Sequence, residues 1–392
     1  MFYPQLIVLR FIFVGEMCRI VTYIAIFILL LTSCGGSGGS GATLGVVGDT
    51  LRMHSSSLLQ IIDCDGYTLV NVKNPWKKDA FLHRYMLLPK DSSDVEVPDG
   101  VTLLRTPLDR QLVFATLHAE LFVMLGRVDA LCGVCDARYM SVPAVKKGLA
   151  DGSIMDCGSS MDVNLERLME LSPSAAWVVP FKNGGYGKMD RAGVPLVECG
   201  DYMETSPLGG AEWMRFYGRL LGVAERADSL FFAVCKNYER VKKMADSAAR
   251  RPRMMCELKS GSAWYMPGGR STMGQLYGDA GADYLFGDND ESGSLPYSFE
   301  AVLAKADSAD VWLFKYGAEV DKGYSSLQQD FQGYTLLRPY RERSVFACNV
   351  SKRRFYEETP FRPDLLLEEL VMLLHPELAE GYEFRYYEKL QE

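Results

Sequence analysis

The sequence predicts an α/β protein with two parallel-sheet lobes, joined by a single long helix and preceded by a small β extension. Short apolar segments alternate with helical segments in two separate regions of the chain, which is typical of βαβ units that build a parallel sheet. Between these regions, residues 224–249 contain no glycine or proline. The two alternating regions also echo each other in sequence, so we expect two lobes of related build.

The first segment, residues 1–34, has the features of an export signal. Arg19 precedes the apolar run 20–31, small residues follow, and Cys34 ends the segment. A basic start, a short apolar core and small residues are typical of secretory signals. The ending Leu-Thr-Ser-Cys resembles a bacterial lipobox, which predicts lipidation of Cys34. The Gly/Ser-rich stretch 35–48 then forms a flexible tether.

The alternative for the N-terminus is a retained transmembrane anchor. Its apolar core is shorter than the ~20 residues that span a bilayer, so a cleaved signal is favoured. Both interpretations place the body of the protein outside the cytoplasm, and lipidation predicts a periplasmic, membrane-anchored lipoprotein. Translation could start at Met1 or at Met17, because Met17-Cys18-Arg19 makes a compact charged start.

Residues 49–208 form the predicted N-terminal lobe with its β extension. The extension, 50–88, contains short apolar runs and the turn signal Asp65-Gly66, so we expect an antiparallel ribbon. The rest of the lobe is predicted to contain strands at 112–115, 130–134, 175–179 and 194–198, and helices at 119–125 and 164–171.

Residues 209–251 form the predicted helical linker. From residue 224, apolar side chains recur every three to four positions opposite a charged face, and Arg251-Pro252 ends the pattern. A helix over 224–249 is about 39 Å long at 1.5 Å per residue, which is long enough to bridge two lobes.

Residues 252–392 form the predicted C-terminal lobe. Strands are expected at 253–258, 264–266, 311–314 and 345–348, and helices at 272–281, 299–306 and 363–374. Here Glu300 starts a helix and Ser308-Ala309 precedes a strand, as Glu166 and Ser174-Ala175 do in the first lobe. This echo is the strongest sign of internal duplication.

Composition and motifs argue against several classes of function. The net charge of −8 disfavours nucleic acid as a partner. The four histidines show no paired spacing of a metal site, and no Walker loop or nucleophile elbow is present. We therefore expect no enzyme activity, no cofactor and no protein-held metal. Cys132 and Cys135 have redox or metal spacing, but without a second such pair buried free thiols are the favoured interpretation.

Loops that follow the predicted strands carry aromatic and basic residues. Ligands of open α/β sheets bind outside the carboxyl ends of the strands, and rings with a few polar groups suit a large, partly apolar ligand. Simple packing of the loops is the alternative role for each residue. The candidate ligand-binding residues are His118, Arg138, Tyr139, Phe181, Trp264, Tyr265, Arg270 and Tyr297.

Several short motifs occur in a fixed order along 101–376. They are His118–Gly126 with Gly133-Val134, Asn164-Leu165-Glu166-Arg167, Leu171-Ser172-Pro173-Ser174, Gly193–Val197, Ala280–Asp283 and Ser298–Glu300. In their order and spacing these motifs resemble the periplasmic binding proteins for iron–siderophore, haem and cobalamin uptake. Ser174 departs from the aspartate that many members carry there, and the β extension is additional.

The resemblance implies a substrate-binding component of an ABC importer, working with a permease and an ATPase. It implies two lobes on one long helix, a ligand in the cleft between them, and one exposed permease-docking glutamate per lobe, Glu166 and Glu300. Charges on opposite lobes can orient docking, although a carboxylate at a helix start also complements the helix dipole. The implied ligand is a ferric siderophore, cobalamin or haem, and we expect a monomer.

Two other functions stay open at this point. A surface scaffold lipoprotein would lack a closed pocket between the lobes and an exposed Glu166–Glu300 pair. An enzyme or metal-cluster protein on the same frame would need cysteines that converge on one cleft, and Cys135, Cys157 and Cys256 are the ones to examine.

Overall fold

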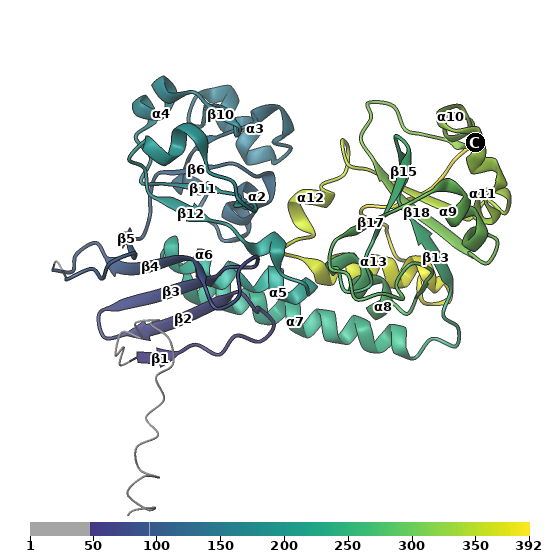
Figure 1. The fold of residues 1–392 in the computed structure, drawn as a ribbon, viewed down its shortest axis with the longest axis horizontal. Coiled ribbons are helices and arrows are strands. Elements are labelled where there is room, and N and C mark those ends of the chain that lie inside the picture. Colours follow the sequence, from purple (N-terminus) through teal and green to yellow (C-terminus); the bar gives the residue numbers. More distant parts are fainter. Residues whose placement is uncertain (1–47, 94) are drawn as a thin grey trace, which may run out of the picture. The chain divides into compact units, whose positions relative to one another are not determined.

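The computed structural model describes residues 48–93 and 95–392 (Figure 1). The predicted signal, Cys34 and all but the last residue of the tether lie outside this part of the chain. Within it, no helix is long and apolar enough to cross a membrane.

The N-terminal extension is a five-stranded sheet with strand order β1-β2-β3-β4-β5. Its strands are β1 (Gly48–Thr50), β2 (Leu59–Cys64), β3 (Tyr67–Lys73), β4 (Phe81–Pro89) and β5 (Thr102–Thr106). The first four pair antiparallel, which confirms the predicted ribbon, and Gly66 has φ 82° in the β2–β3 turn. The fifth strand, parallel to β4, was not predicted.

The first lobe contains a second five-stranded sheet, and every pair in it is parallel. Its order is β12-β11-β6-β7-β8. The strands are β6 (Gln111–Val113), β7 (Leu131–Val134), β8 (Met155–Asp156), β11 (Ala175–Val178) and β12 (Leu196–Glu198), with a separate small pair β9 (Gly158–Ser159) and β10 (Asp162–Val163). The four predicted strands of this region are confirmed.

The second lobe has a five-stranded sheet of order β16-β13-β18-β19-β20, parallel except for β20. Its strands are β13 (Arg253–Cys256), β16 (Asp283–Tyr284), β18 (Val311–Tyr316), β19 (Val345–Asn349) and β20 (Glu388–Lys389). A three-stranded antiparallel sheet adds β14 (Lys259–Ser260), β15 (Ala263–Pro267) and β17 (Ser294–Tyr297). The predicted strand at 264–266 therefore belongs to this smaller sheet.

The helices connect and cover these sheets. Those of the first lobe and the linker are α2 (Thr116–Met124), α3 (Pro143–Asp151), α4 (Leu165–Leu171), α5 (Pro207–Glu212), α6 (Met214–Leu220) and α7 (Ala224–Asp246). Those of the second lobe are α8 (Thr272–Asp279), α9 (Phe299–Ala306), α10 (Tyr324–Asp330), α11 (Arg338–Arg341), α12 (Phe355–Glu358) and α13 (Pro363–Leu374). The predicted helices are all present, whereas α3, α10, α11 and α12 were not predicted.

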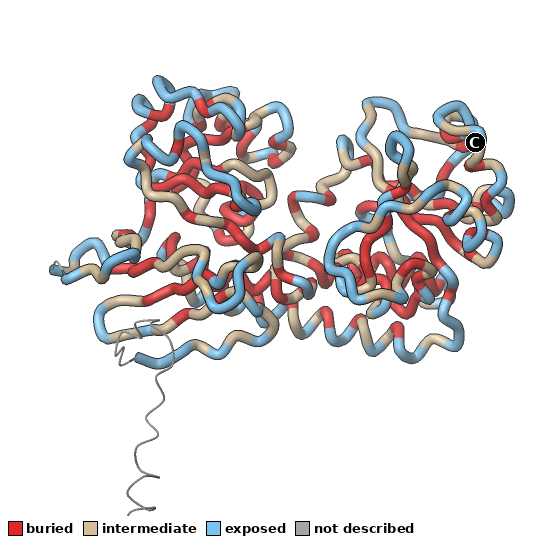
Figure 2. The backbone as a smooth tube through the Cα atoms, in the orientation of Figure 1, coloured by how far each residue is buried: buried red, intermediate tan, exposed pale blue. Residues whose placement is uncertain are grey.

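The long helix α7 contributes to the cores of both lobes. Its buried residues recur every three to four positions, as predicted. Phe231 lies in the core of the first lobe, whereas Tyr238 and Val241 lie in the core of the second. The helix packs on α6 at one end and on α13 at the other (Figures 1 and 2). One amphipathic face therefore joins two separate hydrophobic cores.

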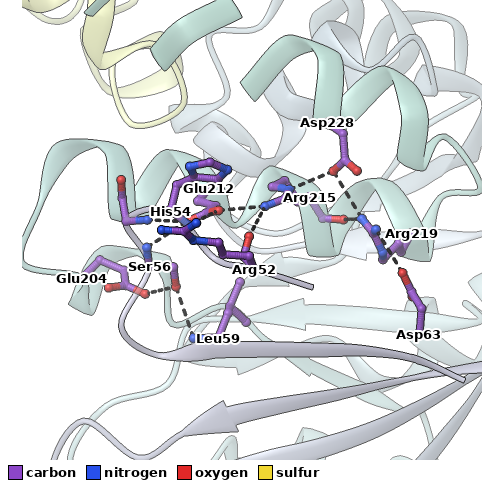
Figure 3. A network of polar contacts seen from close by, with 11 residues as sticks. Arg52, His54, Ser56, Leu59, Asp63, Glu204, Glu212, Arg215, Arg219 and Asp228 are labelled. Atoms are coloured by element: carbon purple, nitrogen blue, oxygen red, sulfur yellow. Dashed lines mark hydrogen bonds and ion pairs between the residues drawn. The ribbon is translucent and has the colours of Figure 1, made fainter. Parts of the chain in front are cut away.

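A buried carboxylate anchors the β extension to the linker helices. Glu212 on α5 is fully buried, and the backbone N–H groups of His54, Ser55 and Ser56 donate to it at 2.8–3.0 Å (Figure 3). Arg215 also donates to Glu212, at 2.9 Å. The carboxylate of Glu212 thus accepts the backbone N–H groups of residues 54–56, which no strand pairs with.

Glu204 binds the next backbone N–H groups of the same segment in the same way. It accepts the backbone N–H groups of Ser57 at 2.9 Å and Leu58 at 3.0 Å, and the indole N–H of Trp213 at 3.0 Å. Glu204 and Glu212 together receive five consecutive backbone N–H groups, from residues 54–58. The extension is therefore fixed to the first lobe by buried, charge-assisted hydrogen bonds.

We expect Glu212→Gln to lower the free energy of unfolding by about 3 kcal/mol, because it leaves Arg215 without this buried partner and turns an amide N–H₂ toward backbone donors. Equilibrium unfolding in guanidinium chloride measures this. Glu239→Gln, at an exposed glutamate of α7, is the control and should stay within about 0.5 kcal/mol of the parent. Equal stability of the two variants would contradict the anchoring role of Glu212.

Candidate functional site

A cavity of about 420 Å³ lies where the carboxyl ends of the two parallel sheets face each other. Asp201 and Tyr202 follow β12 of the first lobe, and Lys315 is the last residue but one of β18 in the second. Phe355 and Tyr356 lie on α12, which follows β19. The full lining is Leu117, Asp201, Tyr202, Ser206, Pro207, Gly210, Thr272, Met273, Leu276, Lys315, Phe355, Tyr356, Thr359, Pro360, Pro363 and Leu366. This is the edge at which open α/β sheets bind their ligands.

The cavity wall is mostly apolar, with two half-exposed rings and one buried cation. Tyr202 and Tyr356 are each 50% exposed. The ammonium group of Lys315 pairs with Glu257 and lies 5.6 Å from the centre of the Phe355 ring. Burial alone would lower the pKa of Lys315, but the charge of Glu257 raises it. Lys315 therefore stays charged beside Glu257 at the wall of the cavity.

The segment around α12 crosses from the second lobe to the first. Glu357 is 4% exposed and accepts the hydroxyls of Thr116, at 3.3 Å, and Ser141, both from the first lobe. Arg354 pairs with Glu120 of α2. These polar contacts join the α12 segment to the first lobe.

Phe361 continues this crossing with an apolar contact. It is fully buried and belongs to the core of the first lobe, although its neighbours in sequence lead into α13 of the second. Its ring centre lies 6.2 Å from that of His118 and 6.1 Å from that of Tyr217. The two lobes are therefore tied at a second place besides α7.

Two of the predicted ligand-binding residues are buried in this structure. His118 is 1% exposed and bonds to Asp201, because it faces the interior of the lobe from the first turn of α2. Trp264 is fully buried and donates its indole N–H to the carbonyl of Cys256 at 3.0 Å. Neither ring is open to a solute in this structure.

The other six predicted residues do not line the cavity between the lobes. Arg138 stacks over the exposed ring of Tyr139 at 4.5 Å, after β7, and Phe181 lines a separate pocket of about 380 Å³ within the first lobe. The remaining three belong to the second lobe. Tyr265 is exposed on β15, Arg270 is exposed just before α8, and Tyr297 is half-buried on β17.

Residues of the cavity that sequence reasoning missed include Tyr202 and Tyr356. Lys315 and its neighbour Tyr316 stand out in the sequence because they follow the apolar run 311–314, but they were not among the candidate ligand-binding residues. Tyr202 and Tyr356 belong to short turns that only the folded chain brings together.

Glu166 and Glu300 occupy matching positions in the two lobes. Each lies exposed in the first turn of a helix, α4 or α9, that leads into a parallel strand. The side chains of Asn164 and Ser298 cap these helices. They accept backbone N–H groups three residues later, from Arg167 at 3.1 Å and from Ala301 at 3.2 Å. Local hydrogen bonds, including one to Ser298, lower the pKa of Glu300, so its carboxylate is charged at neutral pH.

Cys135, Cys157 and Cys256 do not converge on one cleft. Cys135 and Cys157 lie in an apolar cluster of the first lobe, whereas Cys256 lies in the core of the second. The eight cysteines of the described chain are all free thiols. The arrangement required for a metal cluster held by Cys135, Cys157 and Cys256 is therefore not present.

We expect Phe361→Ala to lower the free energy of unfolding by about 3 kcal/mol or more, because it leaves a cavity in a well-packed core. Chemical denaturation gives the value. Phe81→Ala is the matched control, since Phe81 is 48% exposed, and its cost should be below about 1 kcal/mol. Similar losses for the two variants would show that Phe361 does not tie the lobes.

Comparison with known proteins places these features in context. Residues 113–349 match the family described as periplasmic binding protein. An uncharacterized lipoprotein of Methanocaldococcus jannaschii is 23% identical over 344 residues, covering 81% of this chain and 81% of its own length. An uncharacterized protein of the same organism is 19% identical over 243 residues, covering 59% of this chain and 69% of its own.

Solved structures show the same fold. A possible iron-binding (periplasmic solute-binding) protein from Staphylococcus epidermidis has a TM-score of 0.55 at 16% identity, covering 69% of this chain and 100% of that chain. A periplasmic heme-binding protein from Pseudomonas aeruginosa has a TM-score of 0.53 at 18% identity, covering 69% and 93%. The family match, residues 113–349, covers most of the two parallel sheets that border the cavity, but not β20.

Proposed function

The chain belongs to the periplasmic binding protein family, and we propose that it is the lipid-anchored, periplasmic substrate-binding component of an ABC importer. It captures a ferric siderophore, cobalamin or haem and delivers it to a permease and its ATPase. No bond of the solute is made or broken. The observation that carries this proposal is the apolar cavity between the two lobes at the carboxyl ends of both sheets.

The lining of the cavity supports a ligand of this chemical class. Tyr202 and Tyr356 offer flat, half-exposed faces to an aromatic or macrocyclic ligand, and Lys315 offers a charge to a carboxylate or another anionic oxygen. A volume of about 420 Å³ lies within the range of small-molecule sites. Relatives and structural neighbours named as a lipoprotein, an iron-binding protein and a heme-binding protein agree with this class and with export.

The predicted residues that do not line the cavity lie near it in sequence order or on the surface of the same lobes. Arg138 and Tyr139 follow β7 at the same edge of the first sheet, and Phe181 lies in a nearby loop after β11. Tyr265, Arg270 and Tyr297 are accessible on the second lobe. We propose these six as secondary contacts of a ligand larger than the cavity.

A ligand panel tests the proposal. We expect one of cobalamin, cobinamide, haem and several ferric siderophores to raise the melting temperature of the purified full-length chain, because a ligand at 100 times its Kd adds about 2.7 kcal/mol of stability. Tyr356→Ala and Lys315→Met should each weaken binding of that ligand by about tenfold or more.

Tyr265→Ala is the matched control for these variants, since Tyr265 is 49% exposed on the same lobe but outside the cavity. Loss of binding in Tyr265→Ala with full binding in Tyr356→Ala would move the site to the small sheet of the second lobe. A folded protein that binds no compound of the panel would contradict the uptake of these ligands.

We propose further that Glu166 and Glu300 dock onto the permease. Glu166→Ala and Glu300→Ala should each reduce solute uptake by cells severalfold, and the double variant should abolish it, while solute affinity stays unchanged. Glu170→Ala on α4 and Glu319→Ala in the second lobe remove exposed glutamates nearby and should leave uptake intact. Normal uptake by the double variant would rule out the docking role.

A further inference from the structure

A buried cluster in the first lobe brings together an imidazole, a thiol and a carboxylate. His118 lies in the first turn of α2, Cys199 directly follows β12, and Asp201 begins the short turn after it. One nitrogen, sulfur or oxygen atom from each lies within 4.8 Å of the other two, and all three residues are buried. No other trio of this kind occurs among the residues that the structure describes.

The hydrogen bonds of this cluster leave one imidazole nitrogen without a partner among the described residues. The Nε2 atom of His118 lies 3.0 Å from Oδ1 of Asp201, and the hydroxyl of Tyr217 donates to the same oxygen at 2.7 Å. The Nδ1 atom of His118 has no partner among the described residues, although the side chain is 1% exposed. Buried polar atoms are nearly always paired, so the imidazole of His118 has bonding capacity that its contact with Asp201 does not use.

A metal ion takes a neutral imidazole, a thiolate and a carboxylate as ligands, so an ion that binds at this cluster displaces the protons of His118 and Cys199. Access comes from the cavity between the lobes, because Asp201 lines its wall.

We propose that His118, Cys199 and Asp201 bind one divalent transition-metal ion of the zinc or cobalt type, which enters from this cavity. Imidazole nitrogen, thiolate sulfur and carboxylate oxygen are the donors that zinc takes in proteins, and three protein ligands leave a fourth position for a water or another small ligand. Asp201 also lines the cavity proposed for the solute, but the metal proposal does not depend on solute uptake.

Sequence reasoning predicted no protein-held metal because no two histidines have the spacing of a metal pair. The ligands proposed here come instead from one histidine and from the Cys199-x-Asp201 pair, 81 and 83 residues away. The other role for the cluster is a hydrogen-bonded network that only holds the turn after β12. The two roles differ in whether the sulfur of Cys199 contacts a metal.

Cobalt titration of the metal-free, full-length chain distinguishes these roles. We expect Co²⁺ to bind at one ion per chain and to produce the near-ultraviolet absorption of a cobalt–thiolate bond. Cys199→Ser should remove this absorption and weaken binding by at least about tenfold. Cys348→Ser, at a fully buried thiol of the second lobe, is the control and should keep both. Zn²⁺ should displace the cobalt and abolish the absorption.

Absence of a thiolate absorption in the parent chain, or its persistence in Cys199→Ser, would overturn the proposal. X-ray absorption of the zinc-loaded parent chain gives a second test that needs no variant. One sulfur among nitrogen and oxygen neighbours supports the site, whereas nitrogen and oxygen alone contradict it. The solute panel is a separate measurement. A chain that binds no metal can still bind a solute, and a chain that binds no solute can still bind the metal.

Discussion

The apolar face of α7 enters the core of each lobe, and the rest of the structure depends on this shared burial. Phe231 packs with the first lobe, and Tyr238 and Val241 pack with the second. A helix of 23 residues that is buried at both ends cannot bend without exposing apolar surface. Phe361 adds a second tie, because a residue from the second lobe fills part of the first core.

These two connections between the lobes limit how far the cavity can open. With the lobes held by a helix on one side and by the α12 segment on another, we expect opening and closing to be small, unlike the large rotations of proteins with flexible hinges. A cavity of this kind is largely formed before its ligand arrives, which lowers the cost of ordering on binding. Lys315 and the two tyrosines are then held by strands and short helices rather than by long loops.

Much of the fold could be predicted because its signals are local. The face of α7 recurs every three to four residues, the parallel strands are short apolar runs, and Glu166 and Glu300 stand out through the echo between lobes. The cavity could not be predicted in the same way. Tyr356 reaches the site because α12 follows β19 and because Phe361 packs in the other lobe, and no sequence pattern near 355–361 indicates that long-range contact.

The same reason explains why two of the candidate ligand-binding rings are buried. His118 was expected at the cleft because it follows a strand, yet its side chain turns inward to Asp201, a contact between residues far apart in sequence. Trp264 lies on a strand, as predicted, but its ring fills the second core instead of facing the cleft. In each case the position along the chain was identified, but the direction of the side chain was decided by tertiary packing.

The crystal structure of the chain with the solute that most raises its melting temperature tests the central claim most directly. Our account predicts that solute between the lobes, with its rings against Tyr202 and Tyr356 and an anionic group near Lys315. A solute bound instead on the small sheet at Tyr265 and Tyr297, or in the pocket at Phe181, with the cavity between the lobes empty, would contradict it.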